Sequence, residues 1–133
     1  MHDLTEPTFS TADILIVDDN ANIRRLLRAA LSTEFMTVEA EDGVTALQMV
    51  RKHRPKIVLL DVMMQGELNG LATLSAIRED ADICKTWVVM VTARSLDEDF
   101  RNARLHGADG YIVKPFSTLE VLDGVRNMLQ ISA

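Results

Sequence analysis

Short hydrophobic runs alternate along the chain with segments whose hydrophobic positions recur at helical spacing. The runs lie at residues 14–17, 36–40, 57–60, 87–91 and 111–113. After each run, hydrophobic residues recur every three or four positions, a spacing that predicts amphipathic helices and is weakest after the fourth run. Five strands in strict alternation with five helices predict right-handed crossovers and one parallel sheet.

The composition of the runs also predicts the order of the strands. Runs 14–17, 57–60 and 87–91 are hydrophobic throughout, as expected for central strands covered by helices on both faces. Run 36–40 alternates between hydrophobic and polar residues, and run 111–113 is short, so both are predicted to lie at the edges. The expected fold is α/β, a doubly wound parallel sheet of strand order 2-1-3-4-5.

Cap residues mark where the predicted helices begin. Segments 95–98 (SLDE) and 117–120 (STLE) both match the capping box, in which a hydroxyl and a carboxyl group bond backbone amides of the first turn. Asn20 and Asn69 are predicted N-caps, because a side-chain oxygen of asparagine accepts from the amides at a helix start.

Composition and charge exclude several classes of function. The 133 residues are 47% hydrophobic and 26% charged, as in an ordinary globular domain, and no hydrophobic run is long enough to span a membrane. A net charge of −6 argues against direct binding of nucleic acid. The single cysteine, Cys84, excludes an intramolecular disulfide and a cysteine-based zinc site. Residues 1–11 lack the features of a signal peptide. We expect a cytoplasmic location, with residues 1–11 as a disordered leader or cloning remnant before one domain at 12–133.

Polar residues stand where the predicted strands end. Asp18 and Asp19 follow the first run, Asp61 the third, Thr92 the fourth and Lys114 the fifth. Taken singly, the aspartates could cap a helix or turn, Thr92 could be an ordinary strand end, and Lys114 a solvated charge. However, the carboxyl ends of parallel strands share one edge, where ligands bind at the reversal of strand order. Five such residues at one edge therefore predict a shared site.

The residue types at this edge suit a divalent cation and phosphoryl transfer. Two carboxylates about 4 Å apart repel by about 4 kcal/mol at an effective dielectric of ~20, so either their pKa values rise or a cation binds. Oxygen ligands alone favour Mg2+, and no histidine stands at a strand end to favour zinc. With Thr92 and Lys114 available to bind phosphoryl oxygens, Asp61 is the predicted nucleophile that would become an aspartyl phosphate.

These segments resemble the receiver domain of bacterial two-component response regulators, most closely the single-domain chemotaxis type. The resemblance rests on ILIVDDN (14–20), IVLLDVMM (57–64), VVMVTA (88–93) and YIVKPF (111–116), and extends from about residue 12 to 130. It implies a flavodoxin-like (βα)5 fold and a phosphoprotein that acts in signal transduction or a phosphorelay. It also implies a signalling domain with only its own phosphorylation and autodephosphorylation, rather than an enzyme.

The resemblance assigns the phosphoacceptor and the metal ligands. Asp61 is the implied phosphoacceptor. Asp19 and Asp61 are implied direct ligands of Mg2+, with Asp18 acting through water and Met63 through its backbone carbonyl. Lys114 would contact a phosphoryl oxygen, and its bond to the following proline is a candidate for the cis form.

The resemblance also assigns a switch and its tuning residues. Thr92 would move toward the phosphoryl group and Tyr111 would turn inward after it, which changes the face formed by the fourth helix, fifth strand and fifth helix. Small Ala93 would leave room for the phosphoryl group. Met63 and Arg94 stand at positions that tune the loss of this group, and bulky Met63 is expected to shield it from water.

One loop departs from the receiver pattern. Receivers usually carry proline after the methionine that lies three residues past the acceptor, and glycine eight past it. Here Gln65 follows Met64, and Gly70 lies nine residues past Asp61, so the loop has one extra residue. Gly66 tolerates positive φ, but the rigidity of proline is lost. Because the proposed chemistry uses no side chain from 65 to 69, the assignment of Asp61 is unaffected, and the effect of this loop on its rigidity, on phosphoform lifetime and on partner choice stays open.

Three functions remain open on the sequence alone. The leading one is a receiver that is phosphorylated by a sensor histidine kinase or a histidine phosphotransfer protein and then contacts an unknown downstream protein or a second copy. It would bind neither nucleic acid nor membrane directly. A receiver-like interaction module without phosphorylation is the first alternative. An Asp-nucleophile phosphatase is the second, but it would need another aspartate at the position of Met63. Whether the domain acts alone or within a larger regulator stays open.

Overall fold

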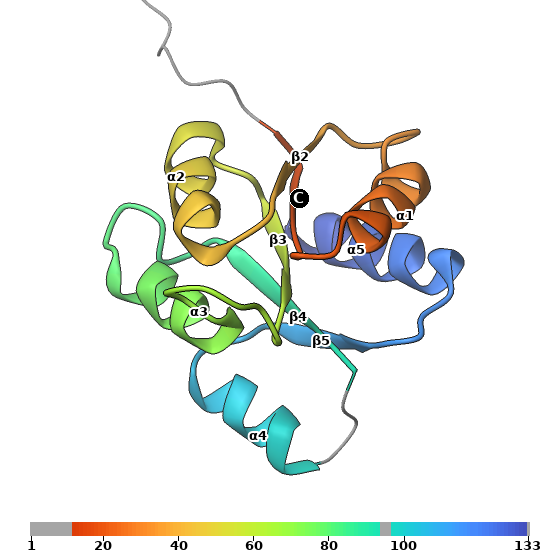
Figure 1. The fold of residues 1–133 in the computed structure, drawn as a ribbon. Helices are drawn as coiled ribbons and strands as arrows, with labels where there is room; N and C mark the ends of the chain where they lie inside the picture. The colour runs from red at the N-terminus through yellow and green to blue at the C-terminus, as the bar shows by residue number, and fades with distance from the viewer. Residues whose placement is uncertain (1–11, 94–96, 133) are drawn as a thin grey trace, which may run out of the picture.

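The computed structural model describes residues 12–93 and 97–132, and the structural statements below concern these residues. They form strands and helices in strict alternation (Figure 1). The strands are β1 (Ile14–Val17), β2 (Thr37–Ala40), β3 (Ile57–Asp61), β4 (Trp87–Thr92) and β5 (Gly110–Val113). The helices are α1 (Ala21–Leu31), α2 (Gly43–His53), α3 (Gly70–Glu79), α4 (Asp97–Leu105) and α5 (Thr118–Ser132).

The strands pair in parallel in the order β2-β1-β3-β4-β5, which confirms the predicted fold class and strand order. Helices α1 and α5 lie together on one face of the sheet, and α2, α3 and α4 lie on the other (Figure 1). This flavodoxin-like arrangement reverses between β1 and β3, so the residues that follow these two strands meet at one edge. No helix among the described residues is long and apolar enough to cross a membrane.

The sheet divides the hydrophobic core into two layers. Alternate residues of β1 point to opposite faces, so Leu15 packs with α2 and α3 while Ile16 packs with α1 and α5. Strands β1 and β3 are buried along their whole length, which explains their continuous hydrophobic sequence. Residues of β5 are all half-buried, as are the first three of β2, in agreement with their predicted edge positions.

Helix starts follow the predicted caps. The side chains of Asn20 and Asn69 accept hydrogen bonds from amides in the first turns of α1 and α3. The Glu120 amide donates to Ser117 Oγ over 3.0 Å at the start of α5, as expected for segment 117–120. Segment 95–98 lies partly outside the described residues. The hydrophobic stripe of α5 is core, as predicted, with Val121 and Val125 buried against the sheet.

The loop after β3 returns tightly to the strand that it leaves. The Gly70 amide donates to the Val62 carbonyl over 3.1 Å. A Cβ at Gly70 would lie 2.2 Å from the Asp61 carbonyl oxygen and 2.6 Å from Val62 Cα, so only glycine fits there. Gly66 has a φ of 106° and open space around it, a left-handed conformation that glycine adopts without strain. We infer that the extra residue is accommodated in this outer turn, while Gly70 fixes the end of the loop against β3.

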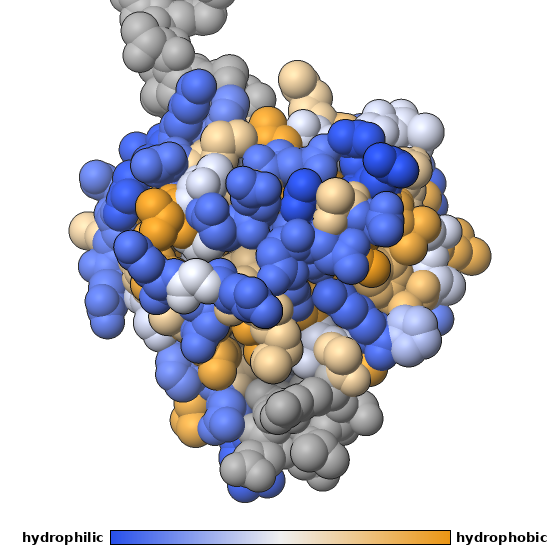
Figure 2. All heavy atoms as spheres, in the orientation of Figure 1, coloured by the Kyte–Doolittle hydropathy of each residue, from blue (hydrophilic) through white to orange (hydrophobic). Residues whose placement is uncertain are grey.

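The face shown in Figure 2 is mainly hydrophilic, with hydrophobic residues in small separate groups. The large hydrophobic side chains with the most exposed surface in the described part of the chain are Leu105, Met36, Leu119 and Met63. They come from different elements, namely α4, the segment before β2, α5 and the loop after β3. Scattered exposure of this kind is ordinary for a folded domain and marks no partner surface by itself.

Candidate functional site

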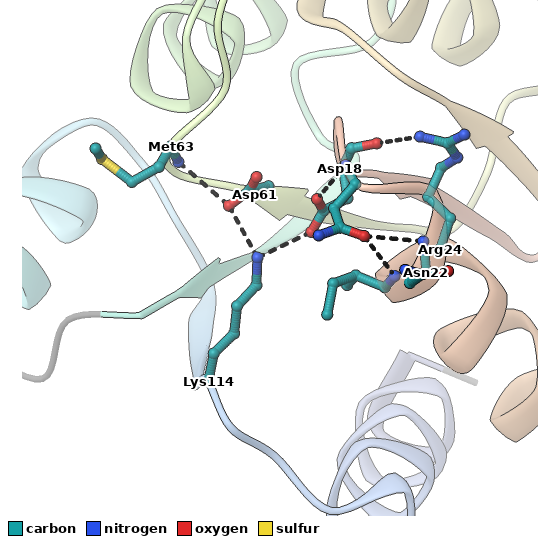
Figure 3. Close-up of polar contacts among 8 residues, drawn as sticks. Asp18, Asn22, Arg24, Asp61, Met63 and Lys114 are labelled. Atoms are coloured by element: carbon teal, nitrogen blue, oxygen red, sulfur yellow. Dashed lines mark hydrogen bonds and ion pairs between the residues drawn. The ribbon is translucent and has the colours of Figure 1, made fainter.

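Three charged side chains meet at the carboxyl edge of the sheet (Figure 3). Asp18 follows β1, Asp61 is the last residue of β3 and Lys114 follows β5. Lys114 Nζ lies 3.0 Å from Asp18 Oδ2 and 3.4 Å from Asp61 Oδ1, so one ammonium bridges both carboxylates. The bond from Lys114 to Pro115 is cis, as expected. The structure therefore brings together residues that lie as far as 96 positions apart in the chain.

Asp18, Asp19 and Asp61 form a cluster of carboxylates. One oxygen from each lies within 4.8 Å of the others. Asp18 and Asp61 are only 1% and 3% exposed, whereas Asp19 is exposed to solvent. Oxygen ligands with one open side are the donor set that Mg2+ uses when it retains several waters. The residues present therefore fit the predicted cation.

Burial and mutual repulsion perturb the ionisation of this cluster. The pKa of the Asp61 carboxyl is raised from 3.8 to about 6, mainly by burial and then by the charge of Asp18. The Lys114 ammonium and the Met63 amide oppose this rise. Burial would lower the pKa of Lys114, but its hydrogen bond to Asp18 and the charges of Asp61 and Asp18 outweigh burial and raise it. The expectation that clustered carboxylates either shift in pKa or bind a cation is confirmed for Asp61.

Backbone groups hold both buried carboxylates in place. The Asn20 amide donates to Asp18 Oδ1 over 2.9 Å, and the Met63 amide donates to Asp61 Oδ1 over 3.2 Å. Because Asn20 is also the N-cap of α1, the start of this helix and the orientation of Asp18 are linked. The Met63 side chain extends away from the charged group (Figure 3) and is 58% exposed. Both carboxylates are thus oriented before any ligand binds.

A cavity of about 400 Å³ adjoins the acidic cluster. It reaches from Asp19 and Thr92 to Tyr111, and Met63 and Met90 form part of its wall. Thr92, at the end of β4, is 3% exposed. The next residue, Ala93, is exposed, so no bulky side chain follows Thr92 at the mouth of the site. Arg94, which was predicted as a tuning residue, lies outside the described residues.

Two arginines near the site had no predicted role. Arg24 in α1 donates from Nη1 to the carbonyl of Asp18 over 2.6 Å (Figure 3), and its Nε lies 3.3 Å from the Glu39 carboxylate in β2. Arg104 in α4 donates from Nη2 to Tyr111 Oη over 2.9 Å. The partner of Arg24 is a main-chain carbonyl, which every residue has, so no sequence signal could have indicated this contact.

Comparison with known proteins gives consistent matches over most of the chain. A family model described as the response regulator receiver domain matches residues 14–126. The chemotaxis protein CheY of Halobacterium salinarum is 37% identical over 118 residues, which cover 87% of this chain and 95% of that protein. The DNA-binding response regulator MtrA of Mycolicibacterium paratuberculosis is 39% identical over 118 residues, which cover 88% of this chain but 51% of MtrA. The chain thus spans about half the length of MtrA.

A solved structure shows the same similarity in three dimensions. The BeF3-activated receiver domain of DrrB, from Thermotoga maritima, superposes with a TM-score of 0.80 at 28% identity. The match covers 90% of this chain and 98% of that chain.

Proposed function

This chain belongs to the response regulator receiver family, and from that membership and the geometry of its acidic site we propose that Asp61 is its phosphoacceptor. Receivers are signalling domains, so the proposed activity is a single phosphorylation event on the protein itself. The observation that supports this assignment is a buried carboxylate at the sheet reversal, held by one ammonium and one backbone amide. Such a carboxylate is oriented for attack on a phosphoryl group. Its negative charge is only partly balanced, because Asp61 shares the Lys114 ammonium with Asp18.

The acidic cluster would hold Mg2+ before transfer. Asp19, Asp61 and the backbone carbonyl of Met63 are the proposed direct ligands, and Asp18 is proposed to act through water. When bound, the cation supplies positive charge against the oxygens of the incoming phosphoryl group. Lys114, which follows β5 at the same edge of the sheet, supplies a second positive charge, and its Nζ already lies 3.4 Å from Asp61 Oδ1.

The transfer itself needs no general base. A carboxylate oxygen of Asp61 forms a bond to phosphorus, and the bond from phosphorus to the histidine nitrogen of the donor breaks. The electron pair of that bond stays on the imidazole, so the donor leaves as a neutral histidine after protonation from solvent. Lys114 and the Thr92 hydroxyl are proposed to bind the transferred oxygens, and exposed Ala93 leaves space for them. The donor would be a sensor histidine kinase or a histidine phosphotransfer protein.

Phosphorylation is proposed to act at a distance through Thr92 and Tyr111. Both residues line the same cavity, so a movement of Thr92 toward the phosphoryl group changes the space available to Tyr111. The surface that would respond is formed by α4, β5 and α5, to which Tyr111 belongs. The downstream target is proposed to be a protein, or a second copy of the chain, that contacts this surface.

The phosphoacceptor assignment is tested by incubation with Mg2+ and acetyl phosphate, followed by intact-mass measurement. We expect one phosphoryl group on the native protein and none on Asp61→Asn. Equal labelling of both proteins would refute Asp61 as the acceptor. If neither protein gains mass or binds beryllofluoride, the chain is a phosphorylation-independent interaction module. Continuous hydrolysis of phosphomonoesters would instead indicate a phosphatase, although the exposed thioether of Met63 stands where that mechanism needs a carboxylic acid.

A further inference from the structure

The side chain of Tyr111 is tied to the last turn of α4. Arg104 Nη2 donates to Tyr111 Oη over 2.9 Å. Arg104 is exposed, whereas Tyr111 is half-buried and packs against the core layer on the α2 and α3 side. The hydrogen bond therefore draws the polar end of the ring toward the surface, while the ring itself contacts the core.

Both ends of this contact stand on fixed backbone. After α4, the Gly107 amide donates to the Arg104 carbonyl over 3.0 Å, and the Gly107 carbonyl accepts from Arg78 Nε over 2.8 Å. Before Tyr111, the Asp109 carboxylate accepts from Arg78 Nη2 and from the Val88 amide, each over 2.8 Å. One arginine of α3 thus fixes the end of α4 and the start of β5 relative to each other. The position of Tyr111 can therefore change mainly through its own side chain.

Tyr111 also lies between two hollow regions. On one side it lines the cavity of about 400 Å³ that reaches Thr92 and Asp19. On the other it lines a groove of about 550 Å³ between β5 and α5. This groove is open at Gly110 and Gly124, where an added Cβ would meet nothing within 4 Å. Because Tyr111 packs with the layer of α2 and α3, displacement of its ring alters a wall of the site cavity, while the strand β5 that carries it borders the groove beside α5.

We propose that Arg104 is a positioning residue that holds the ring of Tyr111 in its outward place and thereby sets how readily phosphorylation moves this ring into the site cavity. This inference rests on the proposed function, because it concerns the response to a group on Asp61. Inward movement of the ring exchanges its hydrogen bond to Arg104 for space in the site cavity beside Met90 and Ala103. Binding and conformation are reciprocally linked. A change that weakens the outward position of the Tyr111 ring must therefore strengthen the binding of any phosphoryl mimic that favours the inward position.

The sequence contains one tyrosine, so Tyr111 can be observed alone. We would incorporate ring-13C tyrosine and record its NMR signals with Mg2+, with and without beryllofluoride as a phosphoryl mimic. In Arg104→Ala without the mimic, we expect the ring signal to shift along the line that joins the free and mimic-bound positions of the native protein. The matched control is Arg101→Ala, which removes the same charge from an exposed position of the same helix and should leave the signal near its native position.

Affinity for beryllofluoride provides the second measurement. Loss of an ordinary hydrogen bond corresponds to a change of about threefold to tenfold in an equilibrium, so Arg104→Ala should bind the mimic about threefold to tenfold more tightly. In a Tyr111→Phe background, which has no hydroxyl to hold, Arg104→Ala should change the affinity by less than about twofold. A general loss of structure would weaken binding in both backgrounds and would not produce this pattern.

Three results would overturn the proposal. The first is a ring signal in Arg104→Ala that moves off the line between the two native positions or does not move. The second is an equal affinity change in Arg101→Ala, and the third is an undiminished effect of Arg104→Ala in the Tyr111→Phe background. If neither the native protein nor Asp61→Asn binds beryllofluoride, the proposed function fails. If the native protein and Arg104→Ala bind beryllofluoride with equal affinity, the proposed role of Arg104 fails and the proposed function does not.

Discussion

Replacing Asp61 with asparagine should stabilise the protein at neutral and alkaline pH when no divalent cation is present. Asparagine keeps the shape of the side chain and still accepts hydrogen bonds from the Met63 amide and Lys114, whose distances to Asp61 Oδ1 are 3.2 Å and 3.4 Å. It removes the charge that burial and Asp18 oppose. The pKa of Asp61 is raised from 3.8 to about 6, and a difference of about 2 units corresponds to about 3 kcal/mol.

The pH dependence follows from the direction of this shift. The folded protein binds the proton of Asp61 more tightly than the unfolded chain does, so the free energy of unfolding falls as pH rises from about 4 to about 6. Above about pH 6, Asp61 is ionised in the folded protein and lowers the free energy of unfolding by the full amount. Below about pH 4, it is protonated in both states and has no such effect. Asp61→Asn should therefore be more stable than the native protein by about 2–3 kcal/mol at pH 8 and equally stable near pH 4.

Urea denaturation with EDTA at several pH values measures these differences. As a matched control, Asp82→Asn removes a carboxylate from an exposed position, and its effect should stay within about 0.5 kcal/mol at every pH. Added Mg2+ should stabilise the native protein and leave Asp61→Asn almost unchanged, because only the former keeps the ligand set. A variant that is less stable than the native protein at pH 8, or a difference that does not vary with pH, would refute this account of the site.

Other changes at the site and in its loop have equally definite expected results. Lys114→Met leaves two buried carboxylates without their ammonium, so the pKa of Asp61 should rise further in a carboxyl NMR titration, and stability in EDTA at pH 8 should fall by about 2 kcal/mol or more. Met63→Asn should shorten the lifetime of the phosphorylated protein if the exposed thioether shields the acyl phosphate, and an unchanged decay of the mass-labelled form would contradict that role. Gly70→Ala places a Cβ 2.2 Å from a backbone oxygen and should destabilise by more than about 2 kcal/mol in urea. Gly124→Ala, where nothing lies within 4 Å, should stabilise α5 by about 1 kcal/mol, and a comparable loss in both variants would show that Gly70 is not constrained by its contact. Binding of Mg2+ near pH 6 should release about half a proton from Asp61 and none at pH 8, as measured by calorimetry in buffers with different ionisation enthalpies.

The fold was predictable because each strand follows from a local property of the sequence. The continuous hydrophobic character of residues 14–17 and 57–60 reflects burial on both faces, and the shorter run at 111–113 reflects an edge. Because all strands are parallel, their carboxyl ends lie at one edge of the sheet, and the site is expected at that edge. For this reason the sequence predicts that Asp18, Asp61 and Lys114 lie close together, although they stand at the ends of three separate strands.

Contacts to main-chain atoms and across turns could not be predicted in the same way. Arg78 donates to the carbonyls of Cys84, Thr86 and Gly107 as well as to Asp109. No residue type at those three positions indicates an acceptor, because carbonyls occur everywhere in the chain. The pairing of Arg104 with Tyr111 depends likewise on the angle at which α4 returns to the sheet, which no local pattern specifies.

The site holds an imbalance of charge that links its proposed steps. Three carboxylates face one ammonium in the described part of the chain, so with every carboxylate ionised the cluster carries about two negative charges. Bound Mg2+ would bring this nearly to zero, and an aspartyl phosphate would make it negative again by about one-half to one charge. In the phosphorylated protein, Lys114 would be attracted by the phosphoryl oxygens as well as by Asp18, so it would exchange its contact with Asp61 for one with these oxygens. Lys114 directly follows β5, and Tyr111 lies within this strand. The same strand therefore connects the residue that is proposed to respond to the new charge with the residue whose outward place Arg104 is proposed to hold.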